Sequence, residues 1–319
     1  MGWRGVVRSM ASAARAAERD AIRRRKLQIK QQISDLAAEA VAEWEAHLDD
    51  IVSIHTDLTD ALDWQQIATK PRPAAPSLMT PKADEASRRI REYKPGLFDF
   101  LQGGAEKIRA RLRTTLEQAE AADRRAAEDA QAAYEAAVVD WQTDVEFANR
   151  IIKREPDAIK ELLEETRSLA AEGMVGSRIE FSISESHLTA IVDVHSDEIV
   201  PKVRRKQLAS GKLSETKMPV GEFNDLYQDY VASAAIKVAG DLFHTLPFDE
   251  LVITCQTTML NPTTGHLEAT PVLSVKFVRP TFTQLNLQAI DPSDAMKNFL
   301  HVMKYSRTKG FSRVEPLSP

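Results

Sequence analysis

Two acidic groups in the carboxyl-terminal half of the sequence have residue types and spacings suited to chemistry. The first is Asp193-Val194-His195-Ser196-Asp197, in which two carboxylates and an imidazole occupy every second position. Every second side chain of a strand points to the same face, so these groups would offer oxygen and nitrogen ligands to a divalent metal. The alternative is a solvated face of an edge strand, because no second cluster of His or Cys completes a ligand set.

The second group is Glu215-Thr216-Lys217, which follows the first group in the order acid, then acid-x-lysine. Metal-dependent nucleases use this order, with carboxylates that hold Mg²⁺ and a lysine that steadies the attacking water. The catalytic residues of a nuclease interpretation are Asp193, Asp197, Glu215 and Lys217. The glycine and proline around the second group are more typical of an exposed loop. The preferred interpretation therefore assigns no catalytic residue, metal or cofactor.

Nucleophilic catalysis has no support in the sequence. The other histidines lack metal-ligand spacing, and the single cysteine, Cys255, lies in a strand-like apolar run without a nearby base. One cysteine excludes an intramolecular disulfide framework and fits a reducing cytoplasm. No run approaches 18 apolar residues, so we expect no membrane span.

Charge is segregated along the chain, although the net charge is only −5. Residues 1–32 hold nine basic and two acidic residues, a net charge of +7, and residues 117–146 hold two basic and nine acidic residues, a net charge of −7. Basic residues recur at helical spacing in the first segment: Arg15, Arg19, Arg23, Lys26 and Lys30. The preferred interpretation pairs the two segments with each other, and the alternative presents the basic arm to nucleic acid or an acidic membrane.

The elements that carry these charges are long helices. Residues 7–67 lack proline and carry an apolar stripe from Ile29 to Ile51, which predicts a long helix over 1–67. Four prolines between residues 71 and 81 predict a connector over 68–104 that contains a short helix. A second stripe from Ile108 to Val145 predicts a second long helix, and Glu155-Pro156-Asp157 begins a shorter one, over 105–172 together.

Opposite charge on the two long helices favours an antiparallel, coiled-coil-like hairpin. Its single apolar stripes would leave a groove for a protein partner or for a second copy of the chain. An apolar patch near the expected tip would close the hairpin or dock a partner: Leu97, Phe98, Phe100 and Leu101.

The period of the sequence changes at Gly173, where an α+β domain over 173–319 is expected. Alternating residues predict strands over 179–183 and 188–194, and a second hairpin over 251–260 and 272–278. Residues 201–217 would form an edge strand or loop, 221–245 a helix on the sheet, and 292–304 a closing helix. This order predicts a small antiparallel or mixed sheet with helices on one face, and no βαβ run.

The last third resembles an uncharacterised module at the carboxyl end of bacterial proteins, some of which carry restriction-endonuclease-like domains. Three segments prompt this resemblance: Asn261-Pro262-Thr263-Thr264-Gly265-His266, Pro271-Val272-Leu273-Ser274-Val275 with Leu285-Asn286, and Asp291-Pro292-Ser293-Asp294-Ala295-Met296. The resemblance implies a bacterial source and a setting of defence against foreign DNA. It implies no activity, because turn and cap residues mark a fold rather than an active site.

These observations favour a non-enzymatic interaction or scaffold protein of the bacterial cytoplasm. The helical hairpin would serve assembly, and the α+β domain would recognise a partner. The alternative is a nucleic-acid-binding or nuclease-like component of an anti-phage defence system.

Overall fold

The computed structural model describes residues 3–77, 79–95, 104–170, 173, 175–184 and 187–318, with the side chains of 3–19 and 166–170 left out. The chain divides into two compact units. Unit 1 combines residues 1–62 with residues 154–319, and unit 2 consists of residues 63–153. Unit 1 is therefore built from two separate stretches of sequence.

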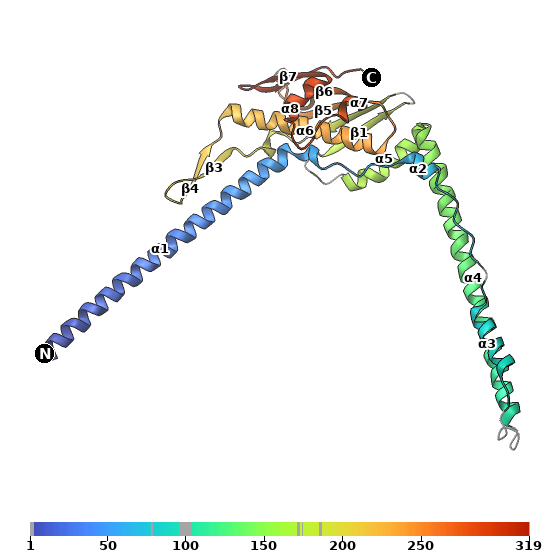
Figure 1. Ribbon diagram of the computed structural model, residues 1–319. Coiled ribbons are helices and arrows are strands. Elements are labelled where there is room, and N and C mark those ends of the chain that lie inside the picture. The colour runs from blue at the N-terminus through green and yellow to red at the C-terminus, as the bar shows by residue number, and fades with distance from the viewer. Residues whose placement is uncertain are drawn as a thin grey trace. The chain divides into compact units, whose positions relative to one another are not determined.

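A six-stranded mixed sheet forms the centre of unit 1, with the strand order β1-β2-β5-β6-β7-β8 (Figure 1). The strands are β1 (Arg178–Ile183), β2 (Leu188–Asp193), β5 (Glu250–Leu260), β6 (Leu267–Val278), β7 (Leu300–Ser306) and β8 (Gly310–Ser312). The hairpins β1–β2 and β5–β6 confirm the sequence prediction. Strands β2 and β5 pair in parallel, so the expected absence of a βαβ connection is wrong.

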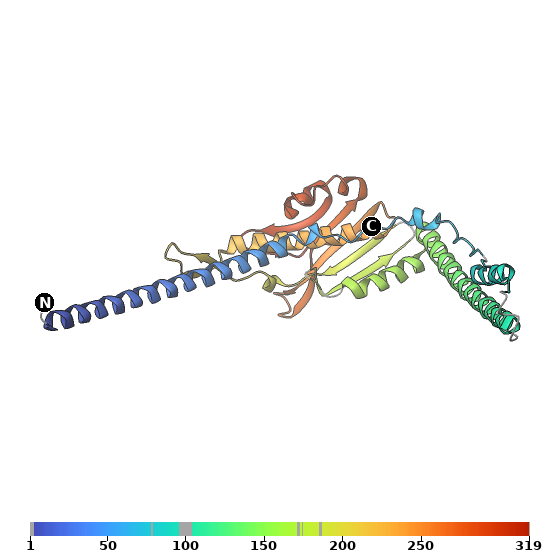
Figure 2. The same ribbon diagram turned by 60° about the horizontal axis from the view of Figure 1, so that its bottom comes forward.

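Helix α6 (Val220–Thr245) makes the connection between β2 and β5 and packs against β5 and β6 (Figure 2). Its sequence from Tyr230 to Ile236 is buried almost without interruption, as expected for a helix on a sheet. Cys255 on β5 is fully buried beneath it, and burial raises the pKa of its thiol to about 12. The thiol is therefore a core group rather than a nucleophile.

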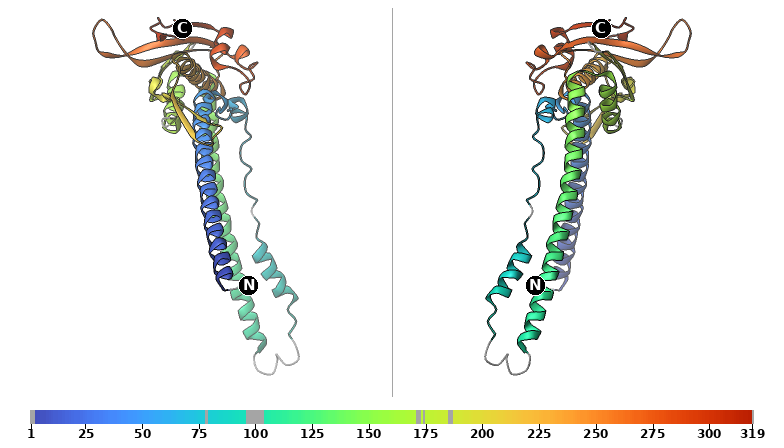
Figure 3. Two further views of the ribbon diagram at one scale, coloured as in Figure 1. Left: turned by 90° about the vertical axis from the view of Figure 1, so that its left-hand side faces the viewer. Right: turned by 90° about the vertical axis from the view of Figure 1, so that its right-hand side faces the viewer.

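Helix α1 (Trp3–Val52) precedes the sheet in the sequence, and its second half packs on the rest of unit 1 (Figure 3). The helix expected through residue 67 ends at Val52. The turn η1 (Ile54–Thr56) follows, and the chain then runs along α6, where the Leu62 amide donates to the carbonyl oxygen of His244 at 2.8 Å. Backbone bonding to α6 replaces the helical ladder in this segment. Helix α5 (Pro156–Ala170) packs beside β1.

The segment expected to be an edge strand or loop folds as a separate two-stranded antiparallel ribbon, β3 (Val203–Gln207) and β4 (Leu213–Lys217). The short turn η2 (Asp197–Ile199) precedes it. Both strands contact α1.

The closing helix expected over 292–304 is wrong beyond its first turn. Asp291 caps α8 (Pro292–Ala295) by accepting the Asp294 amide at 2.9 Å, and η3 (Met296–Asn298) follows, after the earlier turn α7 (Arg279–Phe282). From Leu300 the chain becomes β7, because its backbone pairs with β6. The local cap starts a helix, and tertiary pairing ends it.

Unit 2 consists of α2 (Trp64–Ala68), α3 (Pro81–Glu92) and α4 (Gly104–Ile152). The segment before α4 runs back along it, with Trp64 against Phe147 (ring centroids 5.9 Å apart) and Trp141 Nε1 donating to the Lys70 carbonyl at 2.7 Å. Helices α2 and α3 are the partners of α4 within this unit. The expected pairing of α1 with α4 as a hairpin is not confirmed, and the patch at residues 97–101 lies outside the described residues.

Across the described ranges, no helix combines the length and the apolar character needed to cross a bilayer.

Candidate nucleic-acid interface

One face of α1 carries the basic residues singled out in the sequence. All five lie in α1, and the side chains of Arg23, Lys26 and Lys30, which the structure describes, are exposed. Those of Arg15 and Arg19 lie outside the described side chains. Positions 4, 8 and 11 residues apart share one side of a helix, so Lys30, Lys26 and Arg23 are in line with Ser34.

The ribbon β3–β4 meets α1 at Ser34. The Gln207 carboxamide donates to the Ser34 carbonyl oxygen at 2.7 Å and contacts its hydroxyl oxygen at 3.1 Å. At the ribbon turn, Gly211 has a φ of +82°, and a Cβ there would lie 3.1 Å from the Ser34 side chain. The positive φ and the close approach together favour glycine at this position. The turn of the ribbon lies on the same side of α1 as the basic residues.

The ribbon is itself strongly basic. Residues 202–217 contain six basic residues and one acidic residue, a net charge of +5. The basic residues are Lys202, Arg204, Arg205, Lys206, Lys212 and Lys217. All of these side chains are exposed except that of Arg205, which is half-buried.

Strand register sorts these charges onto two faces. Arg204 lies opposite Thr216 and Lys206 opposite Ser214, so one face combines two cations with two hydroxyl groups. The alternate face carries Arg205, whose Nε bonds the Glu215 carboxylate at 2.9 Å. Arg204 has a weaker partner, the Glu222 carboxylate of α6 at 3.5 Å.

These segments form the basic face, which we define as Arg23, Lys26 and Lys30 of α1 together with the ribbon residues 202–217. The sequence predicted its α1 part and missed its ribbon part. The signal was present, because the basic run Lys202–Lys206 and the run Lys212–Lys217 flank the turn residues Ser210-Gly211. Nothing in the sequence placed this ribbon beside α1.

A small cavity of about 320 Å³ lies behind the ribbon, between α1 and residues 201–205. Trp44, Glu43 and His47 line it from α1. The Trp44 indole nitrogen is buried and has no hydrogen-bond partner among the described residues. The His47 ring nitrogen lies 3.3 Å from the Ile199 carbonyl oxygen. This cavity marks the seam where the ribbon joins α1.

The residues of the nuclease interpretation have separate neighbours. The Asp193 carboxylate on β2 accepts from the side-chain Nε2 of Gln256 at 2.5 Å, and Glu215 on β4 is bonded to Arg205. Asp197 and Lys217 are exposed, and β2 and β4 belong to different sheets. Within the described residues, no group of three or more His, Cys, Asp or Glu side chains is placed to hold a metal. The nuclease site stays a prediction.

His195, between the two carboxylates of the first acidic group, joins a polar cluster under α6. Its backbone amide donates to the Tyr230 hydroxyl at 3.0 Å, and that hydroxyl donates to the Val175 carbonyl at 3.2 Å. The Tyr227 hydroxyl donates to the His195 carbonyl at 2.9 Å, and burial raises the pKa of Tyr227 to about 12. The cluster fastens the start of the sheet to α6.

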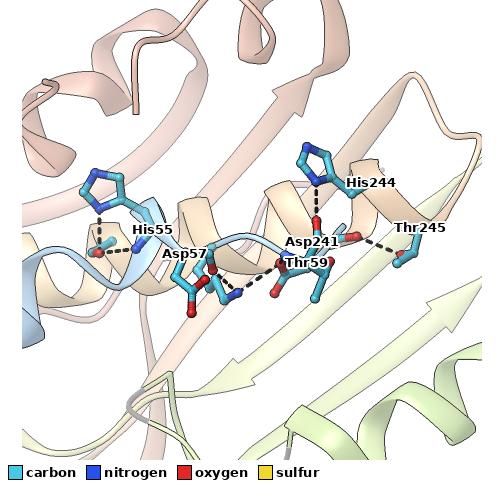
Figure 4. Close-up of polar contacts among 8 residues, drawn as sticks. His55, Asp57, Thr59, Asp241, His244 and Thr245 are labelled. Carbon is cyan, nitrogen blue, oxygen red and sulfur yellow. Dashed lines mark hydrogen bonds and ion pairs between the residues drawn. The ribbon is translucent and has the colours of Figure 1, made fainter. Parts of the chain in front are cut away.

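A Ser–His pair that the sequence did not indicate lies between η1 and α6 (Figure 4). His55 Nδ1 is 2.8 Å from the Ser233 hydroxyl, and Nε2 is 3.0 Å from the Leu287 carbonyl. A carbonyl only accepts, so Nε2 carries the proton and Nδ1 accepts from serine, as in a nucleophile–base pair. Exposure is 3% for His55 and 0% for Ser233, which denies access to a substrate. Burial lowers the pKa of His55, and the pair acts as a clasp.

The clasp begins a polar seam along α6. Asp241 accepts the Thr59 amide at 2.9 Å and pairs with Lys237 at 3.1 Å, and Lys237 also bonds the Asp57 carbonyl (Figure 4). The His244 ring contacts the Thr59 carbonyl at 2.6 Å. These contacts hold residues 55–62 on α6 up to the point where unit 2 begins.

The chain re-enters unit 1 at the turn that follows α6. Arg154 bonds the Asp249 carboxylate at 3.0 Å and lies over the Phe248 ring, 5.3 Å from its centroid. Arg279 holds that turn by donating to the carbonyls of Phe243, Leu246 and Phe248 at 2.6–2.8 Å.

Comparison of the chain with protein-family models, with curated proteins and with solved structures finds no match in any of the three. The resemblance of residues 261–296 to a bacterial module therefore stays an expectation. The basic face gathers exposed Lys and Arg side chains from two segments, and a cluster of this kind creates a positive electrostatic potential.

Proposed function

We propose that this chain is a non-enzymatic binding protein whose basic face holds nucleic acid. The observation that supports it best is the meeting of two basic segments, far apart in the sequence, at Ser34. Exposed Lys and Arg side chains on both segments can displace the counterions of a phosphate backbone, which drives nucleic-acid binding.

The outer face of the ribbon suits phosphate in detail. Arg204 and Lys206 are two residues apart on one strand, so their side chains start about 6.8 Å apart on the same face. Ser214 and Thr216, opposite them, add hydroxyl donors of the kind that proteins use on phosphate oxygens. A regular row of cations and hydroxyls can track an extended row of phosphates.

An acidic membrane is a weaker fit to the same charges. Arg23, Arg24, Arg25 and Lys26 are consecutive, and each residue turns a helix by about 100°, so every side of α1 carries a cation there. A helix that lies in a membrane surface needs a continuous apolar face. In α1 the four consecutive cations interrupt the apolar stripe between Ile22 and Ile29.

The test is fluorescence anisotropy of a labelled DNA duplex, titrated with the full chain at several salt concentrations. We expect the affinity to fall by orders of magnitude between about 50 and 200 mM salt. The double variant Arg204→Ala/Lys206→Ala should lower the salt slope by about two. The control Lys160→Ala/Lys309→Ala removes the same charge from exposed positions elsewhere in unit 1. Equal loss in both variants, or binding to anionic vesicles but not to DNA, would refute the proposal.

A second candidate function is assembly through α1, the scaffold role expected from the sequence. Among the exposed large apolar side chains of α1, four recur at helical spacing between residues 22 and 36: Ile22 (50%), Ile29 (46%), Ile33 (43%) and Leu36 (64%). Their spacing suits a helical partner, either another protein or a second copy. The expected α1–α4 hairpin stays a proposal for how such an assembly is built. Light scattering of the wild type and of Ile33→Asp tests it, and a monomeric wild type would exclude self-assembly.

A location in the bacterial cytoplasm belongs to the same proposal. It is supported by the single, buried cysteine. A role in defence against foreign DNA rests on the resemblance of the last third and is part of this proposal only.

A further inference from the structure

We infer that the nucleic acid is a B-form duplex and that the projecting part of α1 enters its major groove. This inference rests on the proposed function and names the class of nucleic acid bound. It adds that phosphates of the two DNA strands flank α1 on its two sides, and that the ribbon lies against the DNA backbone on one of these sides.

The projecting part of α1 is free to enter a groove. Every side chain from Asp20 to Ile33 is exposed, and the hydrogen bonds between the ribbon and α1 lie beyond this stretch, at Ser34. These 14 residues form a rod roughly 21 Å long. With side chains, a helix is about 10–12 Å across, and the major groove of B-form DNA is about 12 Å wide.

The placement of charge indicates a groove rather than a flat contact. A helix that lies on the outside of a duplex needs cations on one face only. Here Arg23 lies on the ribbon side of α1, Arg24 about a quarter turn from it and Arg25 about half a turn from it. A helix within a groove has a phosphate wall on each flank, which is where these cations point.

The ribbon fits the same arrangement. Its turn touches α1 one helical turn beyond Lys30, and Arg204 and Lys206 face outward. A helix that lies in the groove would bring these two cations toward the backbone that borders it. The ribbon then fixes the register of α1 on the duplex.

Two other classes of nucleic acid fit less well. Single strands are held by aromatic side chains that stack on bases, and residues 20–34 and 202–217 contain no aromatic residue. Duplex RNA has a deep and narrow major groove that excludes a helix. We therefore expect DNA duplex to bind at least about tenfold more tightly than either at equal length and salt.

Anisotropy of the full chain with three labelled probes, a DNA duplex, an RNA duplex of the same sequence and the single DNA strand, tests the preference. Tighter binding to the DNA duplex is expected. Salt-dependent binding that is equal or tighter on the RNA duplex or the single strand overturns the inference and leaves the proposed function standing. If none of the three probes shows salt-dependent binding, both the inference and the proposed function are refuted.

A matched pair of variants tests the groove. Arg24→Ala/Arg25→Ala removes two cations that point away from the ribbon side, and Arg23→Ala/Lys30→Ala removes two on that side. A groove predicts that each pair lowers the salt slope by about two. An unchanged slope for Arg24→Ala/Arg25→Ala, with loss for the other pair, means contact on one face only and overturns the inference. All four side chains are exposed, so circular dichroism should show unchanged helix content.

Discussion

Gln207 on β3 holds Ser34 on α1 through both the carbonyl and the hydroxyl oxygen, at 2.7 and 3.1 Å, although 173 residues separate them. The contact joins two basic segments that like-charge repulsion would otherwise drive apart. A contact that holds two basic surfaces together supports the proposal that the basic face binds a polyanion.

Gly211→Ala should weaken both the ribbon and DNA binding. Gly211 has a φ of +82°, and an alanine methyl group there would lie 3.1 Å from the Ser34 side chain; Gly265 has a φ of +69°, and a methyl group there would have no atom within 4 Å. The left-handed backbone costs each alanine variant about 1 kcal/mol. Only Gly211→Ala should also speed hydrogen exchange at residues 203–217 and lower DNA affinity. Equal effects of the two variants on DNA affinity would contradict the role of the junction.

The clasp at His55 should make stability depend on pH. Burial lowers the pKa of His55 from its ordinary 6.5, so the unfolded chain binds the proton more readily than the folded chain. The free energy of unfolding should therefore be fully present above about pH 6.5 and fall as the pH drops below it. His55→Gln should flatten this dependence in denaturant titrations, whereas the exposed His266→Gln should keep it. If the pH dependence of the free energy of unfolding is the same in His55→Gln as in the wild type, His55 is not its source.

Asp229 should have the opposite effect. Burial is the largest cause and raises its pKa, a hydrogen bond from Ser293 lowers it, and the nearby carboxylates of Asp291, Asp225 and Asp294 raise it again, so that the pKa is about 6. The folded chain holds the proton more tightly, so this residue favours folding below its ordinary pKa of 3.8 and loses that contribution as the pH rises through about 6. Asp229→Asn should stabilise the protein on the order of 1 kcal/mol at pH 7–8, and the gain should vanish near pH 4.

The control for Asp229 is Glu180→Gln, which alters an exposed carboxylate that pairs with Arg178 and is not among the groups that raise the pKa of Asp229. We expect it to change stability little at any pH, because exposed ion pairs contribute little. A gain at neutral pH as large as that of Asp229→Asn would show that general charge reduction, rather than burial of Asp229, is responsible.

Asp123→Ala should loosen α3 in unit 2. The Asp123 side chain is 5% exposed and accepts the Ala83 amide in the first turn of α3 at 2.8 Å. Removing it leaves a helix amide without its partner, at a cost of about 1–2 kcal/mol. Hydrogen exchange at residues 81–92 should speed up. The control Asp129→Ala changes an exposed residue of α4, the helix that carries Asp123, and should leave this exchange unchanged. Faster exchange in both variants would point to the loss of charge instead.

Elements with strong local signals were predicted from the sequence. Helix α4 (Gly104–Ile152) lies within one residue, at either end, of the helix that the sequence predicts over 105–153, since its apolar stripe and flanking glycine define it locally. Helix α6 and the hairpins β1–β2 and β5–β6 were likewise predicted. In each of these elements, the hydrophobic period and the flanking turn residues indicate the same type of structure.

Elements whose structure depends on distant contacts were not predicted from the sequence. The sequence at Leu300 continues a capped helix, and only β6 makes it a strand. The basic ribbon at residues 203–217 is a weak strand signal, and its place on α1 depends on Gln207 and Ser34, which no local pattern links. The His55–Ser233 pair joins residues 178 positions apart for the same reason. Long-range register is the information that a single sequence lacks.

Two contacts within unit 1, at the end of α6 and the turn after it, fix the points where the chain leaves for unit 2 and returns, as in a domain inserted into another. Leu62 is bonded to His244 before residues 63–153 begin, and Arg154 is bonded to Asp249 directly after they end. Both attachment points are fixed without help from the inserted stretch, and loop-closure entropy changes slowly with the length between them. An ancestor could therefore have acquired, lengthened or exchanged this arm by recombination while the sheet stayed intact.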